Sequence, residues 1–167
     1  QKYESFFVEE ADAFDEDTLF MWQFIQYEFL VEWSEIKAYA NQKGIKIIGD
    51  IPIYVALDSA DVWADPTQFQ LDKNNQPKCV AGCPPDYFSE DGQLWGNPLY
   101  DWNYMEKDDF KWWLSRISQS LKTYDCVRID HFRAFASYWE IPADSDTAKN
   151  GAWAKGPGMK LFNKVKE

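Results

Sequence analysis

The sequence predicts an α/β fold built on a parallel sheet, and three observations support this prediction. Two stretches, residues 19–42 and 108–123, carry apolar side chains at steps of three and four, which is typical of helices. A short β-branched run follows each stretch, at residues 45–50 and 125–130, and such runs are typical of buried strands. Because a helix leads into a strand twice, we expect about two parallel strands with their helices, separated by a long βα loop excursion.

The first predicted helix carries apolar residues on more than one face, so we expect it to be largely buried on two sides. Asp15, Asp17 and Thr18 are candidate N-caps, and Gly44 suits the end of the helix. The main stripe comprises Trp22, Ile25, Phe29, Trp33, Ile36 and Ala40, and the residues that widen it are Phe20, Phe24, Tyr27, Leu30 and Val31.

The predicted domain spans residues 19–167, and residues 1–18 form an acidic lead-in with seven carboxylates. The whole chain carries 17 basic and 28 acidic residues, a net charge of −11. This charge disfavours a nucleic-acid partner, and it also disfavours docking to an anionic membrane. Three cysteines make no disulfide framework, so we expect a reducing, cytoplasmic setting.

Residues 52–107 follow neither a helix nor a strand pattern, although they are rich in aromatic residues. They hold six of the eight prolines, and a segment this long without regular structure is uncommon unless it is functional. A disordered linker would carry fewer aromatics, so we expect an ordered excursion over a site. The predicted core aromatics are Trp22, Trp33, Phe110 and Trp113, and the candidate ligand contacts are Tyr87, Phe88 and Trp95.

The second predicted strand brings an arginine and an aspartate to one face. Side chains alternate along a strand, so Cys126, Arg128 and Asp130 share a face, with Arg128 and Asp130 about 6.6 Å apart at a rise of ~3.3 Å per residue. A nearby arginine favours the ionised carboxylate that a nucleophile requires, but a structural ion pair explains the same spacing equally well. Asp50 ends the first strand in a similar way, although alone it also fits a helix cap or a turn.

Several carboxylates and aromatic rings in one cleft are typical of carbohydrate sites, because sugar C–H faces stack on rings and hydroxyls bind carboxylates. The sequence has no Walker A or G-x-G-x-x-G stretch, so it indicates no nucleotide cofactor. Cys79 and Cys83 leave zinc as an alternative, but their spacing is loose and the single histidine, His131, lies far along the chain. We therefore expect neither a metal nor a cofactor.

Six segments in the same order resemble the 4-α-glucanotransferases, also called amylomaltase or disproportionating enzyme, of glycoside hydrolase family 77 in the α-amylase clan. The likeness runs from about Phe24 to the end of the chain. The segments are Gly49-Asp-Ile-Pro-Ile-Tyr-Val55, Asp58-Ser-Ala-Asp-Val-Trp63, Gly82-Cys-Pro-Pro-Asp-Tyr-Phe-Ser89, Gly92-Gln-Leu-Trp-Gly-Asn-Pro-Leu-Tyr100, Val127-Arg-Ile-Asp-His-Phe-Arg133 and Tyr138-Trp-Glu-Ile-Pro142.

This resemblance implies part of a (β/α)8 TIM barrel and a retaining double displacement on α-1,4-glucans. The implied substrates are a maltooligosaccharide or α-glucan donor and a sugar acceptor. Asp130 matches the nucleophile, and Arg128 matches the residue that positions and ionises it. The matched substrate-binding positions are Asp50 and His131 near the bond cleaved, Asp86, Tyr87, Phe88 and Ser89 in a mobile loop, and Gln93 and Trp95 as flanking glucan contacts.

A retaining glycosidase needs a second carboxylate about 5–5.5 Å from the nucleophile. The resemblance places this acid/base and a stabilising aspartate beyond Glu167, so we expect an interior fragment of the catalytic barrel, truncated at both ends and inactive alone. We also expect self-association through open strand edges. The alternatives are a non-catalytic α-glucan-binding or structural module, and an α-glucan hydrolase of the same clan.

Overall fold

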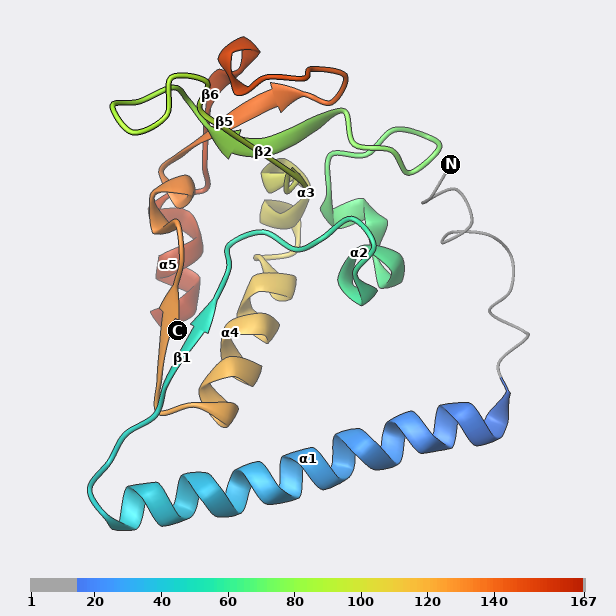
Figure 1. Cartoon of the computed structure of the whole chain (residues 1–167), viewed down its shortest axis with the longest axis vertical. Coiled ribbons are helices and arrows are strands. Elements are labelled where there is room, and N and C mark those ends of the chain that lie inside the picture. Colours follow the sequence, from blue (N-terminus) through green and yellow to red (C-terminus); the bar gives the residue numbers. More distant parts are fainter. Residues whose placement is uncertain (1–14, 167) are drawn as a thin grey trace. The chain divides into compact units, whose positions relative to one another are not determined.

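The computed structural model describes residues 15–166, which form two compact units (Figure 1). One unit consists of residues 15–51 and 116–128, and the other consists of residues 52–115 and 129–166. Most of the predicted acidic lead-in, residues 1–14, lies outside the described residues, as does residue 167.

Helix α1 (Glu16–Gln42) belongs to the first unit and begins three residues before the predicted start at Leu19. Asp15 is its N-cap: the carboxylate accepts hydrogen bonds from the Thr18 backbone N–H at 3.2 Å and from the Thr18 hydroxyl at 2.6 Å. This cap explains the earlier start, because it satisfies a free donor of the first turn. The helix ends as predicted before Gly44, whose φ of +76° lies in the left-handed region.

The apolar faces of α1 are exposed, so the prediction that this helix is buried on two sides is wrong. None of its residues is buried, and Trp22, a predicted core residue, keeps 56% of its surface exposed. The periodicity identifies which residues share a face, but burial depends on what packs against that face. The contacts that join α1 to its unit lie in its C-terminal half.

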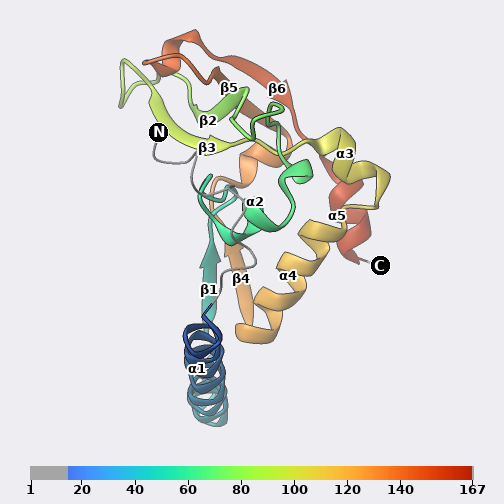
Figure 2. The same ribbon diagram turned by 90° about the vertical axis from the view of Figure 1, so that its right-hand side faces the viewer.

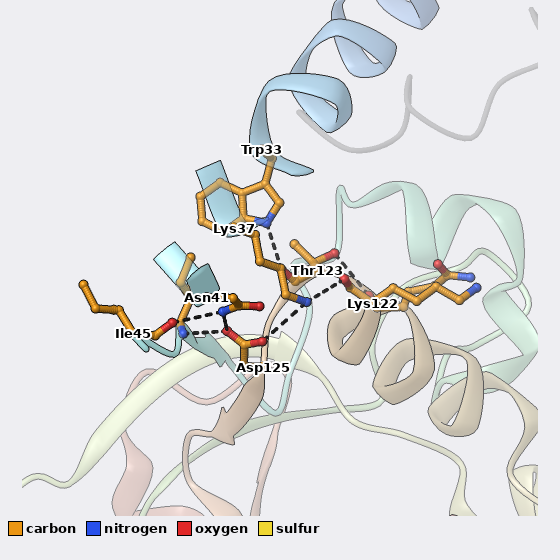
Figure 3. Close-up of polar contacts among 9 residues, drawn as sticks. Trp33, Lys37, Asn41, Ile45, Lys122, Thr123 and Asp125 are labelled. Atoms are coloured by element: carbon orange, nitrogen blue, oxygen red, sulfur yellow. Dashed lines mark hydrogen bonds and ion pairs between the residues drawn. The ribbon is translucent and has the colours of Figure 1, made fainter. Parts of the chain in front are cut away.

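Two side chains of α1 bind the backbone of residues 122–123, just before the strand predicted at residues 125–130 (Figure 3). Trp33 donates its indole N–H to the carbonyl oxygen of Thr123 at 2.8 Å, and its ring meets Tyr124 edge-on. Lys37 donates from Nζ to the carbonyl oxygen of Lys122 at 3.0 Å. Trp33 is therefore half-buried, although the first half of the helix is not covered.

The Asp125 carboxylate binds both the end of α1 and the segment just before strand β1 (Ile48–Ile51) (Figure 3). Its Oδ2 accepts hydrogen bonds from Asn41 Nδ2 at 2.9 Å and from the backbone N–H of Ile47 at 2.8 Å. Asn41 also donates to the carbonyl oxygen of Ile45 at 3.0 Å. This small network fixes the turn between the helix and the strand.

Strands β1 (Ile48–Ile51) and β4 (Cys126–Ile129) form a two-stranded sheet, and their arrows point the same way (Figures 1 and 2). The two predicted parallel strands are therefore confirmed, with shorter bounds. Gly49 in β1 permits the close approach of Tyr124, since a Cβ at this position would lie 2.1 Å from Tyr124 Cδ2.

The second unit holds a four-stranded antiparallel sheet that the sequence analysis missed (Figures 1 and 2). Its strand order is β3-β2-β5-β6, so β2 pairs with a strand that begins more than fifty residues later. Residues 52–107 are ordered, as expected, but they contain strands and short helices instead of an irregular excursion. The strands are β2 (Cys79–Cys83), β3 (Gln93–Pro98), β5 (Ser137–Pro142) and β6 (Ala152–Lys155).

Helices and 3₁₀ turns make up much of the remaining structure, and one of them, α4 (Lys111–Thr123), runs from the second unit into the first. Helix α4 begins at Lys111, later than predicted, because Asp109 and Phe110 take positive φ values of 58° and 59° and break the helix. None of the helices within residues 15–166 is long and apolar enough to cross a membrane. The helices are α2 (Ala60–Ala64), α3 (Trp102–Lys107), α4 (Lys111–Thr123), α5 (Met159–Lys166) and the 3₁₀ turns Pro66–Gln68, Phe132–Phe135 and Ala148–Asn150.

Aromatic rings fill the core of the second unit. Trp113 is fully buried and Phe110 nearly so, which confirms both as core residues. Trp113 packs edge-on against Tyr100 and Phe135, with ring centroids 5.5 and 5.0 Å apart. Many of the aromatics in this chain thus serve packing, and the site uses only some of them.

Candidate active site

Asp50 and Arg128 form an ion pair where β1 and β4 approach their ends in the first unit. Arg128 Nη1 lies 2.5 Å from Asp50 Oδ2, and both side chains are 58% exposed. The predicted alternation along β4 is confirmed by burial, since Arg128 is exposed whereas Val127 and Ile129 are half-buried. The sequence spacing predicts that Arg128 lies near Asp130. The structure shows an ion pair between the Arg128 guanidinium and Asp50.

Asp130 follows β4 in the chain and lines a pocket of about 210 Å³ in the second unit. The pocket combines a carboxylate, an imidazole, an amide and two aromatic side chains. Rings can stack on the C–H faces of a sugar while the polar groups bind its hydroxyls. The lining residues are Pro52, Ile53, Tyr54, Trp95, Asn97, Asp130 and His131.

His131 has an unusual backbone in this pocket. Its φ of 51° and ψ of 40° lie in the left-handed region, which costs a non-glycine residue roughly 1–2 kcal/mol. Burial lowers the pKa of the His131 imidazole, the Asp130 carboxylate opposes this effect, and Arg133 adds to it. The lowered pKa favours the neutral imidazole at pH 7, in which one ring nitrogen can donate a hydrogen bond and the other can accept one.

Trp95 is held in the pocket by several contacts. Its indole N–H donates to Gln93 Oε1 at 2.9 Å, and its ring lies 6.3 Å from the Tyr54 ring. Tyr54 stacks on the buried Tyr100 at 5.9 Å, and the Tyr100 hydroxyl donates to the carbonyl oxygen of Ile53 at 2.7 Å. Burial raises the pKa of the Tyr54 hydroxyl, so this residue adds no charge to the pocket.

The predicted loop residues form a self-bonded turn beside β3. The Asp86 carboxylate accepts hydrogen bonds from the backbone N–H groups of Phe88 and Ser89, both at 2.8 Å. The Ser89 hydroxyl donates to the carbonyl oxygen of Gly92 at 2.8 Å. Tyr87 and Phe88 are 96% and 94% exposed, so their rings are accessible. These loop residues do not line the pocket that holds Asp130, and their contact with a glucan stays a prediction.

The sequence-based site omits four of the residues that line the pocket, and two of these, Tyr54 and Asn97, carry polar side-chain groups. Asn97 donates from Nδ2 to the carbonyl oxygen of Val55 at 2.9 Å, which ties β3 to the segment after β1. Both residues lie within segments that carry the family resemblance, and this was the available signal. Their position in the pocket depends on long-range pairing, which local sequence does not reveal.

The two cysteines of β2 are poorly placed to share a metal. Cys79 and Cys83 stand at opposite ends of the strand, about 13 Å apart at ~3.3 Å per residue, whereas zinc binds each thiolate at ~2.3 Å. Burial also raises the pKa of both thiols, which disfavours the thiolate form. Within residues 15–166, no group of three or more His, Cys, Asp or Glu residues is arranged to hold a metal ion.

Comparison with known proteins identifies the family. A model of glycoside hydrolase family 77, described as 4-alpha-glucanotransferase, matches residues 1–167. The chain belongs to glycoside hydrolase family 77. Its family 77 relatives include the 4-alpha-glucanotransferase of Clostridium butyricum, 59% identical over 157 residues that make up 93% of this chain and 32% of the relative. The enzyme of Thermus thermophilus is 54% identical over 86% of this chain and 29% of the relative, so the chain spans about a third of their length.

Solved family 77 structures share the fold. An amylomaltase from Streptococcus agalactiae in complex with acarbose has a TM-score of 0.82 at 54% identity, over 84% of this chain and 28% of that one. An amylomaltase from Corynebacterium glutamicum has a TM-score of 0.78 at 17% identity, over 95% of this chain and 22% of that one, and supports the fold alone. The α/β fold with parallel and antiparallel strands is therefore that of the amylomaltases.

Proposed function

We propose that this family 77 chain serves 4-α-glucanotransfer, in which α-1,4-glucan segments pass between maltooligosaccharides. The observation that carries the proposal is the Asp130 carboxylate in a pocket with His131, Trp95 and Tyr54. This set can both hold a sugar ring and attack it. The donor is a maltooligosaccharide or an α-glucan, and the acceptor is the 4-hydroxyl of another sugar.

In the proposed reaction, Asp130 attacks the anomeric carbon of the donor. The bond from this carbon to the glycosidic oxygen breaks, an ester to the Asp130 carboxylate forms, and a general acid protonates the leaving sugar. The acceptor hydroxyl then displaces Asp130 and gives its proton to the same group, so the configuration is retained. We assign no residue of this chain to that acid/base.

The remaining site residues bind and orient the glucan in this proposal. Arg128, which forms an ion pair with Asp50, supplies positive charge near the carboxylates of Asp50 and Asp130. Asp50 and His131 bind hydroxyls near the bond cleaved. The flanking contacts are Asp86, Tyr87, Phe88, Ser89, Gln93 and Trp95.

We also propose that β1 and β4 are strands of a (β/α)8 barrel, in which the carboxyl ends of the strands carry the catalytic residues. Within the described part of the chain each of these strands pairs with one other strand, and apolar side chains of α1 are exposed. Both features support self-association of the 167-residue chain. Size-exclusion chromatography with light scattering tests the self-association, and a monomer would contradict it.

A cytoplasmic setting remains a prediction from the cysteine content.

A chimera tests the proposed activity. This chain replaces the matching 157 residues of the Clostridium butyricum relative, and the product is incubated with maltotriose. We expect glucose together with longer maltooligosaccharides. Asp130→Asn should lower the rate on the order of 10⁴-fold, the scale of removing a catalytic carboxylate, whereas Glu35→Gln on exposed α1 should leave it unchanged.

Other outcomes of the same assay identify the alternatives. New reducing ends without longer products would indicate a hydrolase. Binding of maltotriose by a folded chimera without turnover would indicate a non-catalytic glucan-binding module. The 167-residue chain alone should not turn over maltotriose, and measurable transfer by it would contradict the expectation that it is inactive alone.

A further inference from the structure

The pocket holds the only histidine of the chain, and an aromatic ring faces it. The His131 and Trp95 rings meet edge to face, with centroids 4.8 Å apart and planes at 84°. We propose that Trp95 is a positioning residue for His131: its indole fixes the plane of the imidazole beside Asp130 and covers the ring from water. The catalytic consequence of this inference rests on the proposed function, but its structural test does not.

The backbone of His131 is the first argument for such a restraint. Its left-handed φ of 51° is unfavourable for a non-glycine residue, and such a conformation persists only where surrounding contacts hold it. His131 precedes the 3₁₀ turn Phe132–Phe135 without making a side-chain cap hydrogen bond. Capping therefore does not explain the presence of histidine at this position, whereas the contact with Trp95 gives its ring a defined place.

The contacts of Trp95 are the second argument, because a ring must itself be held in place to position another. The indole N–H is held by Gln93 Oε1 at 2.9 Å. The Tyr54 ring also lies near the indole, with centroids 6.3 Å apart, and stacks on the buried Tyr100. Trp95 thus links the core of the second unit to His131, which stands next to the proposed nucleophile.

The charge environment of His131 is the third argument. The charged groups that act on it are Asp130, which favours the imidazolium, and Arg133, which disfavours it. The uncharged rings of Trp95 and Tyr54 also line the pocket. Burial outweighs the effect of Asp130 and lowers the pKa of His131. We attribute part of this burial to the Trp95 ring, which meets the imidazole edge to face.

Nuclear magnetic resonance of the 167-residue chain tests this inference directly. Because the chain has a single histidine, labelling of histidine Cε1 gives one signal per state, which can be titrated with pH without assignment. In the unsubstituted chain we expect a depressed His131 midpoint and nuclear Overhauser contacts between the imidazole and the indole of Trp95. Absence of these contacts would overturn the proposal.

Three variants extend the test. Trp95→Leu should raise the His131 midpoint toward its ordinary value and abolish the ring-current shift that the indole imposes on the histidine signal. Trp95→Phe keeps a ring and should preserve most of both effects. Trp63→Leu removes a half-exposed tryptophan on α2 and should leave the histidine signal unchanged. An unchanged midpoint in Trp95→Leu would also overturn the proposal, and if that variant does not fold, the Overhauser contacts and Trp95→Phe decide.

Kinetics in the chimera separate positioning from simple glucan contact. A positioning role predicts that Trp95→Leu lowers kcat and shifts the pH profile of transfer, while Trp95→Phe restores both. A contact role alone predicts a higher KM with an unchanged histidine titration. A chimera without activity would contradict the proposed function but leave the magnetic resonance result valid, so the two failures are distinguishable.

Discussion

Arg128 Nη1 lies 2.5 Å from Asp50 Oδ2, so two residues of the candidate site hold each other at the ends of neighbouring strands. Both side chains are more than half exposed, and exposed ion pairs contribute about 0–1 kcal/mol to stability. We predict that Arg128→Met changes the free energy of unfolding by less than about 1 kcal/mol. Urea denaturation of the 167-residue chain measures this.

The same substitution should abolish most transfer in the chimera. Lys160→Met is a matched control, because it removes another exposed ion pair, to Glu106, and neither residue lines the pocket that holds Asp130. A large loss of stability in Arg128→Met with little loss of transfer would indicate that Arg128 has a structural role. This is the alternative that the sequence spacing left open.

Asp125 is predicted to make the stability of the first unit depend on pH. The pKa of its carboxyl is lowered first by the Ile47 N–H and then by Asn41, desolvation opposes this, and Lys37 and Lys46 add smaller effects. The carboxylate therefore stabilises the fold above the ordinary pKa of about 3.9, and this stabilisation is lost as the pH falls through the lowered pKa of the folded state.

Asp125→Ala should therefore lower the urea midpoint at pH 7 and flatten its dependence on pH below about pH 4. Glu35→Ala, an exposed carboxylate of α1, should leave the midpoint at pH 7 close to that of the unsubstituted chain. Equal acid sensitivity of Asp125→Ala and the unsubstituted chain would show that the network of Figure 3 does not control this transition.

Gly49 is predicted to be irreplaceable because of Tyr124. In Gly49→Ala, the new Cβ would lie 2.1 Å from Tyr124 Cδ2, and overpacking of this kind costs about 1–3 kcal/mol. Tyr124→Ala removes the clashing ring, so Gly49→Ala should cost clearly less in that background. A double-mutant cycle from urea denaturation measures the coupling, and additive effects would contradict the steric explanation.

The elements that local sequence predicted are those with a strong local pattern. The helix from Glu16 and the strands β1 and β4 follow from periodicity and β-branched runs. Strand β2 (Cys79–Cys83) was not predicted because it contains glycine and small residues with weak strand preference. This strand exists through pairing with distant segments, for example Gly82 with Trp139.

The candidate site divides in the same way. Alternation along one strand predicts that Arg128 and Asp130 share a face, and this prediction needs only local geometry. In the structure β4 ends at Ile129, and Asp130 follows it. Tyr54 and Asn97 join the pocket from two other segments, so no local pattern could select them. The exposed helix α1 shows the opposite limit, because an apolar stripe predicts a buried face without specifying its partner.

Asp86 is predicted to build the loop that displays Tyr87 and Phe88. Its Oδ1 accepts from two backbone N–H groups at 2.8 Å, and each such bond contributes about 0.5–1.5 kcal/mol net. Asp86→Ala loses both bonds, so the loop should open more often and chymotrypsin should cleave after its exposed aromatics roughly tenfold faster. Gel analysis over time measures the rate.

Asp86→Asn separates the turn from the charge. Its amide oxygen can accept the same two hydrogen bonds, so this variant should resist chymotrypsin like the unsubstituted chain. Asp91→Asn, which weakens only the exposed ion pair to Lys149 in the same loop, should also resist. If the Asp86→Asn and Asp86→Ala variants are cleaved equally fast, the charge of the carboxylate, and not its two hydrogen bonds, keeps the loop closed. If both resist cleavage but both lose transfer in the chimera, Asp86 acts on the glucan as the family resemblance implies.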